Sequence, residues 1–219
     1  MTGAVSVFDQ RAEDYDRWFD SPVGKELFRV EVEAVRFLMR GIERPFLEVG
    51  VGTGRFAKAL GIDLGIDPSA KELEIAESRG VRVLQRGAEA LPFGNESFGA
   101  VFILFTFCFV ADPAAVLSEA KRVLKRNGAL IVGMINKESP WGQLYETKKA
   151  QGHPIYQEAR FYRIEEAESL IAGSGLKIDR YSSALCLPPS DQPHDEIAYD
   201  RLVENAGFVC IRAIKSQGV

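Results

Sequence analysis

A glycine-rich segment near the start of the chain constrains its fold more than any other feature. Residues 46–55 read FLEVGVGTGR, so an apolar run leads into three alternating glycines. The apolar run predicts a short strand, and residues 53–60 have the spacing of a helix. Glycines at such a junction let the chain turn tightly, adopt positive φ and bring its backbone against a ligand. The segment therefore predicts a ligand-binding turn between a strand and a helix.

The chain after this turn repeats the alternation of strand and helix. We expect strands over residues 45–49, 62–66, 81–84, 99–104 and 129–135. We expect helices over residues 53–60, 68–79 and 113–124, with the last of them stopping at the turn Asn127-Gly128. Strands that alternate with helices imply βαβ units and a parallel sheet covered on both faces.

The two ends of the chain have a different pattern. Residues 11–40 have helical periodicity interrupted by a turn at 20–24, which predicts two helices ahead of the first strand. Residues 137–161 are irregular or helical and rich in aromatic residues, and a helix is expected over 165–172. Finally, residues 176–185 and 208–215 alternate like two strands that can pair antiparallel.

Composition and charge exclude several classes of function. Apolar residues make up 46% of the chain, which is enough for a core of its own. The formal net charge is −4 and no cluster of lysine and arginine is present, whereas a duplex nucleic acid requires a basic surface. The longest apolar stretch, residues 100–111, is too short to span a bilayer. We therefore expect a small-molecule substrate, no nucleic acid partner and no membrane span.

The cysteines point to a reducing compartment. Cys108, Cys186 and Cys210 are odd in number and far apart, and none belongs to a C-x-x-C pair. This pattern argues against a disulfide scaffold or a zinc ribbon, and we expect no metal site. The N-terminus has no basic patch followed by an apolar run, so we expect no signal peptide and a cytoplasmic location. Nothing in the sequence predicts an oligomeric state.

The residues around the glycines discriminate between nucleotide-like ligands. A dinucleotide fingerprint that begins at Gly50 would need glycine where Arg55 stands, and the Gly-Lys-Ser/Thr of a P-loop is absent. Glu48 lies inside the first predicted strand, which in NAD-binding proteins is normally apolar. A carboxylate there suits a ligand with a cation and hydrogen-bond donors, and the sulfonium and ammonium groups of S-adenosylmethionine supply both. The pattern E-x-G-x-G-x-G therefore favours S-adenosylmethionine, with an NAD(P)-linked oxidoreductase as the alternative.

Asp67 closes the second predicted strand, at the edge of the sheet where ligands bind in such folds. A carboxylate in this place can accept hydrogen bonds from both hydroxyls of a ribose. It can equally cap the helix that is expected to begin at Pro68. Both roles are open at this point.

Several further motifs follow in a fixed order. They are LEVGVGTG at 47–54, GIDPS at 65–69, GAEALPF at 87–93, SF at 97–98, DP at 112–113, EAKRVLK at 119–125 and GALIV at 128–132. With them the chain resembles the class I S-adenosylmethionine-dependent methyltransferases, in the branch similar to the ubiquinone/menaquinone-biosynthesis methyltransferases. The resemblance covers residues 8–135 well and the remainder loosely.

The resemblance implies a fold and a domain organisation. The expected fold is a Rossmann-like, doubly wound α/β sheet of seven strands, mostly parallel with an antiparallel C-terminal strand, plus N-terminal lid helices. We expect a single domain over residues 1–219. Within it, residues 1–40 would form the helical lid, 41–136 the cofactor-binding half, and 137–219 the substrate-side insert and C-terminal strands.

The resemblance also implies an activity and a site. The activity is methyl transfer from S-adenosylmethionine to a small-molecule acceptor by in-line displacement, leaving S-adenosylhomocysteine. An aromatic side chain near the sulfonium would attract it through its π face. The implied cofactor-binding residues are Glu48, Gly50, Gly52 and Gly54 around the methionine part, Asp67 at the ribose, Pro68, Ala88 and Glu89 at the adenine, Leu104 after the fourth strand, and Tyr15 and Trp18 in the lid.

The chain departs from the family pattern in two places. Gly87 stands where the family commonly has an aspartate that contacts the adenine amine, so Ala88 or Glu89 would have to take its place. Cys108 and Phe109 stand where relatives often carry a histidine, which removes one candidate base.

The acceptor side of the site is less defined by the sequence. No catalytic residue is identified, and the candidates for a proton acceptor are His153, Tyr145 and Glu146. We expect an apolar acceptor pocket after the fourth and fifth strands, and core packing is the alternative role for the same side chains. The candidate lining residues are Phe105, Phe107, Phe109, Trp141, Tyr145, Phe161 and Tyr162. The alternative functions are an arsenite-type methyltransferase that uses the cysteines, and a non-catalytic S-adenosylmethionine-binding protein.

Overall fold

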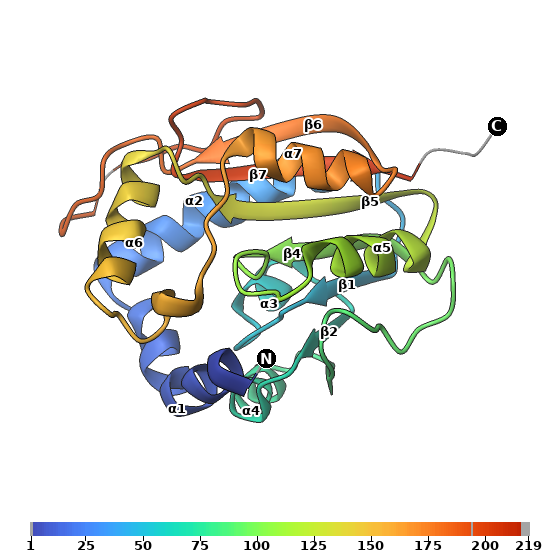
Figure 1. The fold of residues 1–219 in the computed structure, drawn as a ribbon, viewed down its shortest axis with the longest axis horizontal. Coiled ribbons are helices and arrows are strands. Elements are labelled where there is room, and N and C mark those ends of the chain that lie inside the picture. Colours follow the sequence, from blue (N-terminus) through green and yellow to red (C-terminus); the bar gives the residue numbers. More distant parts are fainter. Residues whose placement is uncertain (1, 194, 216–219) are drawn as a thin grey trace.

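The computed structural model describes residues 2–193 and 195–215, with side chains described from residue 7 on. In this part of the chain a seven-stranded sheet is covered by helices on both faces (Figure 1). The strands are β1 (Phe46–Val49), β2 (Leu64–Asp67), β3 (Val83–Gln85), β4 (Phe98–Leu104), β5 (Leu124–Ile135), β6 (Lys177–Ala184) and β7 (Phe208–Ile214). The helices are α1 (Thr2–Trp18), α2 (Pro22–Met39), α3 (Arg55–Leu60), α4 (Ala70–Ser78), α5 (Pro113–Val123), α6 (Pro140–Ala150) and α7 (Ile164–Gly173), with a 3-10 turn η1 (Tyr156–Glu158).

The strand order of the sheet is β3-β2-β1-β4-β5-β7-β6. The strands from β1 to β5 pair in parallel, and β7 runs antiparallel to both β5 and β6. This topology confirms the predicted fold, including the antiparallel C-terminal strand. The order of the strands reverses between β1 and β4, and ligands of open α/β sheets bind beyond the carboxyl ends of the strands at such a point.

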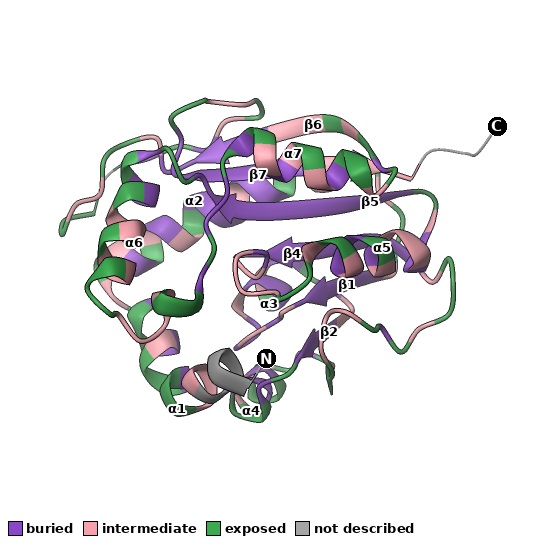
Figure 2. Cartoon of the chain, viewed as in Figure 1, coloured by how far each residue is buried: buried purple, intermediate pink, exposed green. Residues whose placement is uncertain are grey.

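Alternating side chains of the strands supply two separate apolar layers. In β4, Phe102 packs with α2 and α3, while its neighbours Val101 and Ile103 pack with α5 and α7. Figure 1 shows α5 and α7 in front of the sheet and α2 and α3 behind it. The strand β4 is buried along its whole length, and β5 is buried from Gly128 to Ile135 (Figure 2). Each large apolar side chain that is fully buried contributes about 1.5–3 kcal/mol to folding, so the sheet is a rigid base for the loops at its ends.

The helix expected over residues 113–124 is confirmed, since α5 spans Pro113–Val123, but the strand after it begins earlier than expected. We expected a turn at Asn127-Gly128 and a strand from residue 129, whereas β5 begins at Leu124. Leu124 is fully buried and pairs with Phe98 of β4, so the strand includes the residues that were expected to form the turn. The expected turn lies inside β5, where Asn127 has a φ of +60°.

The two N-terminal helices, which we expected to form one lid over residues 1–40, have different surroundings. Val30, Val35 and Leu38 of α2 are fully buried against the sheet, so α2 is part of the core. The helix α1 instead packs beside α4, at the end of the sheet that carries the glycine-rich turn (Figure 1). Within the described residues, no helix combines the length and apolar character that crossing a membrane requires.

Candidate functional site

The glycine-rich turn after β1 is held from both sides. The N–H groups of Gly50 and Val51 donate to the carbonyl oxygen of Ile66 in β2, at 2.8 and 2.9 Å. The hydroxyl of Thr106, which follows β4, donates to the carbonyl oxygen of Gly50 at 3.1 Å. A Cβ atom added at Gly50 would lie 2.1 Å from the Thr106 hydroxyl oxygen, and φ there is +75°. The turn therefore depends on glycine at this position, where backbone and threonine are in close contact.

Asp67 is oriented by two backbone donors. Its Oδ2 accepts from the N–H of Gly52 at 3.0 Å, and its Oδ1 accepts from the N–H of Ser69 at 2.8 Å. Ser69 is the N-cap of α4, because its hydroxyl accepts from the N–H of Glu72 at 3.2 Å. The helix therefore begins after Pro68 with Ser69 as its cap, so Asp67 does not have the capping role. Burial raises the pKa of Asp67 to about 6.

Two further carboxyl groups lie close to Asp67. Glu48 is 2% exposed, and its Oε2 has no hydrogen-bond partner among the described residues. Burial raises the pKa of Glu48 well above its usual value, and Asp67 raises it further. Glu72 of α4 is also buried, and its carboxylate lies 3.7 Å from the place that a Cβ on Gly52 would occupy. Burial, Asp67, Asp9 and Asp16 raise the pKa of Glu72 to about 8.

The three carboxyl groups make this site strongly suited to a cation. A buried acceptor without a partner costs free energy until a ligand supplies a donor. A ligand with positive charge and hydroxyl donors satisfies Glu48, Asp67 and Glu72 together. Glu72 was not predicted as a site residue, because an acidic residue in the first turn of a helix is also expected from the helix dipole alone.

A pocket of about 160 Å³ surrounds these carboxyl groups. Nine of the eleven residues that we expected around the cofactor line it: Tyr15, Glu48, Gly50, Gly52, Asp67, Pro68, Ala88, Glu89 and Leu104. Gly54 does not line this pocket. It is the N-cap of α3 and packs against α4, where an added Cβ would lie 2.9 Å from the Cβ of Ala76. Trp18 does not line it either: this residue, at the end of α1, is 44% exposed and lines a second pocket.

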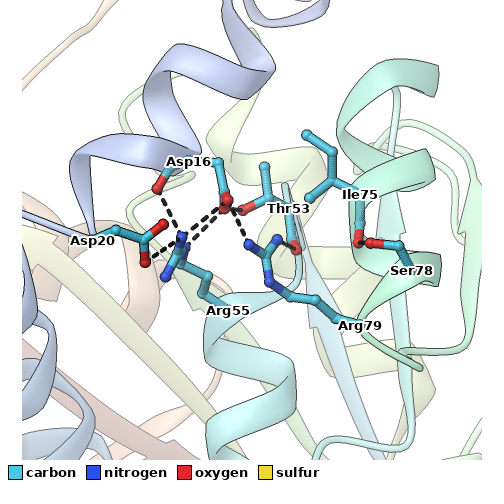
Figure 3. Close-up of polar contacts among 7 residues, drawn as sticks. All are labelled: Asp16, Asp20, Thr53, Arg55, Ile75, Ser78 and Arg79. Atoms are coloured by element: carbon cyan, nitrogen blue, oxygen red, sulfur yellow. Dashed lines mark hydrogen bonds and ion pairs between the residues drawn. The ribbon is translucent and has the colours of Figure 1, made fainter.

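The helix α1 is fastened to the glycine-rich turn by Asp16. Arg55 makes two hydrogen bonds to the Asp16 carboxylate, at 2.8 and 2.9 Å, and the Thr53 hydroxyl donates to it at 2.7 Å. Arg79, the residue that follows α4, forms an ion pair with the same carboxylate (Figure 3). Burial alone would raise the pKa of Asp16, but the hydrogen bonds from Arg55, Arg79 and Thr53 lower it to about 2. Arg55, the residue that rules out a dinucleotide fingerprint in the sequence, thus has a structural role in joining α1 to the turn.

A second, larger pocket of about 980 Å³ adjoins the first. The two pockets share the side chains of Phe8, Tyr15, Phe19, Phe105 and Phe109. Of the seven residues that we expected to line the acceptor pocket, five line this second pocket: Phe105, Phe109, Trp141, Tyr145 and Phe161. Phe107 and Tyr162 do not line it, because they are buried in the other apolar layer with their ring centroids 5.1 Å apart.

Two of the three candidate proton acceptors lie at the second pocket, and the third does not. His153 and Tyr145 line the second pocket. Burial, Lys148 and Arg11 lower the pKa of His153, whereas burial raises the pKa of Tyr145 well above its usual value. Glu146 does not line the pocket and pairs with Lys137 at 3.4 Å.

The cysteines are not arranged as a metal or arsenic site. Cys210 is buried in β7, while Cys108 and Cys186 lie in separate loops. Among the described residues, no group of three or more histidine, cysteine, aspartate or glutamate side chains is placed to hold a metal ion. The arsenite-type alternative therefore has no structural support.

Comparisons with known proteins agree with this geometry. A family model described as a methyltransferase domain matches residues 47–132. The crystal structure of an S-adenosylmethionine-dependent methyltransferase from Thermotoga maritima, described as a possible histamine N-methyltransferase, is similar with a TM-score of 0.89. It is 38% identical and covers 96% of this chain and 99% of that chain.

Curated sequences extend the comparison. An uncharacterised protein of Mycobacterium tuberculosis is 43% identical over 96% of this chain and 74% of its own length. A demethylmenaquinone methyltransferase of Thermotoga maritima is 33% identical over 59% of this chain and 60% of its own length.

Proposed function

This chain belongs to the S-adenosylmethionine-dependent methyltransferase family, and from that premise we propose that it methylates a small-molecule acceptor held in the second pocket. S-adenosylmethionine is the cofactor, and when bound it supplies a methyl group activated by the positively charged sulfur. The observation that carries the proposal is the pair of adjoining pockets at the carboxyl ends of β1, β2, β4 and β5. The first contains three carboxyl groups, and ten of the residues that line the second are phenylalanine, tyrosine or tryptophan.

The residues of the first pocket fit this cofactor. Each Asp67 oxygen accepts one backbone hydrogen bond and retains a lone pair for a ribose hydroxyl. The unpartnered Oε2 of Glu48 and the nearby Glu72 supply acceptors and negative charge for a cationic ligand. Pro68, Ala88 and Leu104 provide apolar surface in the same pocket.

Glu89 is the residue that we propose for the adenine amine. A Cβ added at Gly87 would lie 3.3 Å from the Glu89 Oε2, so the Glu89 carboxylate stands over Gly87. A carboxylate there can accept the hydrogen bond that the family's aspartate receives. This arrangement supports the expectation that Glu89 compensates for the glycine.

The side chains between the pockets have a positioning role. Tyr15, Phe19 and Phe109 line both pockets. An acceptor in the second pocket and the cofactor in the first would therefore meet beside these three aromatic side chains. Methyl transfer requires alignment of the acceptor and exclusion of water more than it requires an acid–base group. An aromatic enclosure supplies both.

Calorimetry and a transfer assay test the proposal. We expect S-adenosylhomocysteine to bind the purified protein and NAD not to bind. We then expect labelled methyl groups to pass from S-adenosylmethionine to at least one member of a broad panel of small amines, alcohols, thiols and phenols. Preferential binding of NAD would contradict the cofactor assignment. Tight S-adenosylhomocysteine binding without transfer to any panel member would instead support a non-catalytic binding protein.

A further inference from the structure

The second pocket contains a buried carboxylate that methyl transfer in general does not require. Glu31 of α2 lines this pocket and is only 6% exposed. Two other acidic residues of the same helix, Glu26 and Glu33, pair with Arg29 near the surface. Among the described residues, none forms a hydrogen bond or ion pair with the Glu31 carboxylate. An ionised carboxylate that is buried without a partner destabilises the folded protein, unless a bound ligand supplies a positive charge or a hydrogen-bond donor.

The groups that surround Glu31 are neutral or acidic. Burial raises the pKa of Glu31 well above its usual value, and the nearby Glu196 raises it further. The hydroxyls of Tyr15, Tyr145 and Tyr156 lie within electrostatic range of the same carboxyl group.

The basic groups of the pocket do not neutralise Glu31. Arg11, Lys148 and His153 line the pocket, but none of them forms an ion pair with Glu31. The ammonium of Lys148 instead lies 5.3 Å from the centre of the Tyr145 ring. Negative charge near Glu31 is therefore unbalanced by the protein itself.

Aromatic rings enclose the space beside this carboxylate. The ring centroids of Tyr145 and Tyr156 are 4.8 Å apart, and those of Tyr145 and Phe161 are 5.9 Å apart. Trp141 stacks on Tyr145 with a centroid distance of 6.5 Å. Aromatic faces attract organic cations, and the attraction is largest where water is excluded. A carboxylate among such rings suits a ligand that combines a positive nitrogen with an apolar frame.

We propose that the methyl acceptor is a small amine and that Glu31 is the residue that selects it, by pairing its carboxylate with the protonated nitrogen. The carbon frame of the amine packs among Tyr145, Tyr156 and Phe161. This inference rests on the proposed function, since it assigns the acceptor to the second pocket. Before methyl transfer the bound nitrogen gives its proton to the Glu31 carboxylate, which breaks an N–H bond, forms an O–H bond and leaves the lone pair that attacks the methyl group. A neutral alcohol of the same shape forms no ion pair with Glu31, and a carboxylic acid is repelled.

Titration calorimetry with matched ligands tests the proposal. The protein is saturated with S-adenosylhomocysteine and titrated with phenethylamine, tryptamine and butylamine, and separately with 2-phenylethanol, tryptophol and butanol. We expect at least one amine to bind about 10- to 100-fold more tightly than its alcohol, the range for a hydrogen bond to a charged group. In Glu31→Gln this preference disappears, while the affinity for the alcohols is unchanged.

The control is Glu33→Gln, two residues along the same helix, where the side chain is 45% exposed. This variant should keep the full preference for amines. Glu31→Gln should also unfold at the same temperature as the unaltered protein or higher, because it replaces a buried carboxyl group whose ionisation is opposed by burial. Glu31→Leu, which removes the polar atoms altogether, should show the same loss of amine preference.

The outcomes separate this inference from the proposed function. If no amine binds the unaltered protein better than its alcohol, or if Glu31→Gln and Glu31→Leu retain the preference, the role of Glu31 is refuted. Methyl transfer to a neutral acceptor together with such a result would leave the proposed function standing. Failure of S-adenosylhomocysteine to bind any of these proteins would instead contradict the cofactor site, whose residues do not include Glu31.

Discussion

Asp67 shows how one carboxylate can be prepared for a ligand. Two backbone N–H groups hold its two oxygens in place, so the side chain loses little conformational freedom when a ligand binds. We predict that Asp67→Ala weakens S-adenosylhomocysteine binding by about 10- to 100-fold, because hydrogen bonds to a charged acceptor are lost. Calorimetry measures the change. Asp14→Ala, which removes an exposed ion pair with Arg17, is the control and should bind normally. Equal affinity in the two variants would remove Asp67 from the site.

Gly52 is constrained by its backbone rather than by crowding. Its φ is +51°, while the nearest atoms to an added Cβ are those of Glu72, 3.7 Å away. A β-branched residue in this conformation costs about 1–3 kcal/mol and puts methyl groups beside the Glu72 carboxylate. We predict that Gly52→Val lowers the affinity for S-adenosylhomocysteine at least 10-fold. Gly61→Val has the same kind of backbone strain, with φ +67° and open space around it, outside the pocket. A comparable loss of affinity in that control would mean that strain alone is responsible.

The sequence was most informative where a residue is tied to a motif. Glu48 and Asp67 could be predicted because each has a fixed position relative to the glycines and the strand ends. Glu72 could not, since its burial depends on how α4 packs against the turn. Glu31 could not be predicted either, because the sequence of α2 contains several acidic residues of similar spacing. It is singled out only by the folded structure, in which aromatic residues of α6 and η1 line the same pocket.

At the scale of elements, α1 is held to the rest of the molecule by the ion pairs of Asp16, by hydrogen bonds to Asp9 and by the contact of Phe8 with Phe109. Removing one partner from a buried ionic cluster leaves the others uncompensated and is strongly destabilising. We predict that Asp16→Asn loosens α1, so that its amides exchange hydrogen at least about 10-fold faster while those of α5 do not change. Mass spectrometry of deuterium uptake measures both helices in one experiment. Asp14→Asn on the exposed side of α1 is the control. Unchanged exchange in α1 would show that its apolar contacts suffice.

The periodicity of the sequence predicted the existence of the elements better than their ends or their partners. The spacing of apolar residues identified α2 and α5, yet it did not distinguish a helix of the core from a helix of the lid. The start of β5 was missed because residues 124–128 suit a turn as well as a strand, and only the pairing of Leu124 with Phe98 decides between them. The alternation of β6 and β7 made their pairing possible, but the long loop between them in the sequence left it open until the structure showed it.

At the scale of the whole molecule, the site lowers the stability of the free protein in a way that depends on pH. The folded-state pKa values of Asp67 and Glu72 are raised from 3.8 and 4.5 to about 6 and about 8. Between the unfolded and folded values the folded state binds more protons than the unfolded state. The contribution of these groups to stability is therefore fully present below about pH 4 and is lost as the pH rises through 6 and then 8.

A cationic ligand reverses this effect, because it binds best when the carboxyl groups are ionised. We predict that the rise in melting temperature caused by saturating S-adenosylmethionine increases from pH 6 to pH 8. The affinity itself should increase by up to about 10-fold per pH unit for each group that must lose a proton. Differential scanning fluorimetry across this range, with and without the ligand, measures the difference. In Glu72→Gln the dependence between pH 7 and pH 8 should become shallower, since the group with the higher pKa no longer titrates. A stabilisation that is constant or falls over this range would show that these carboxyl groups are already ionised in the free protein.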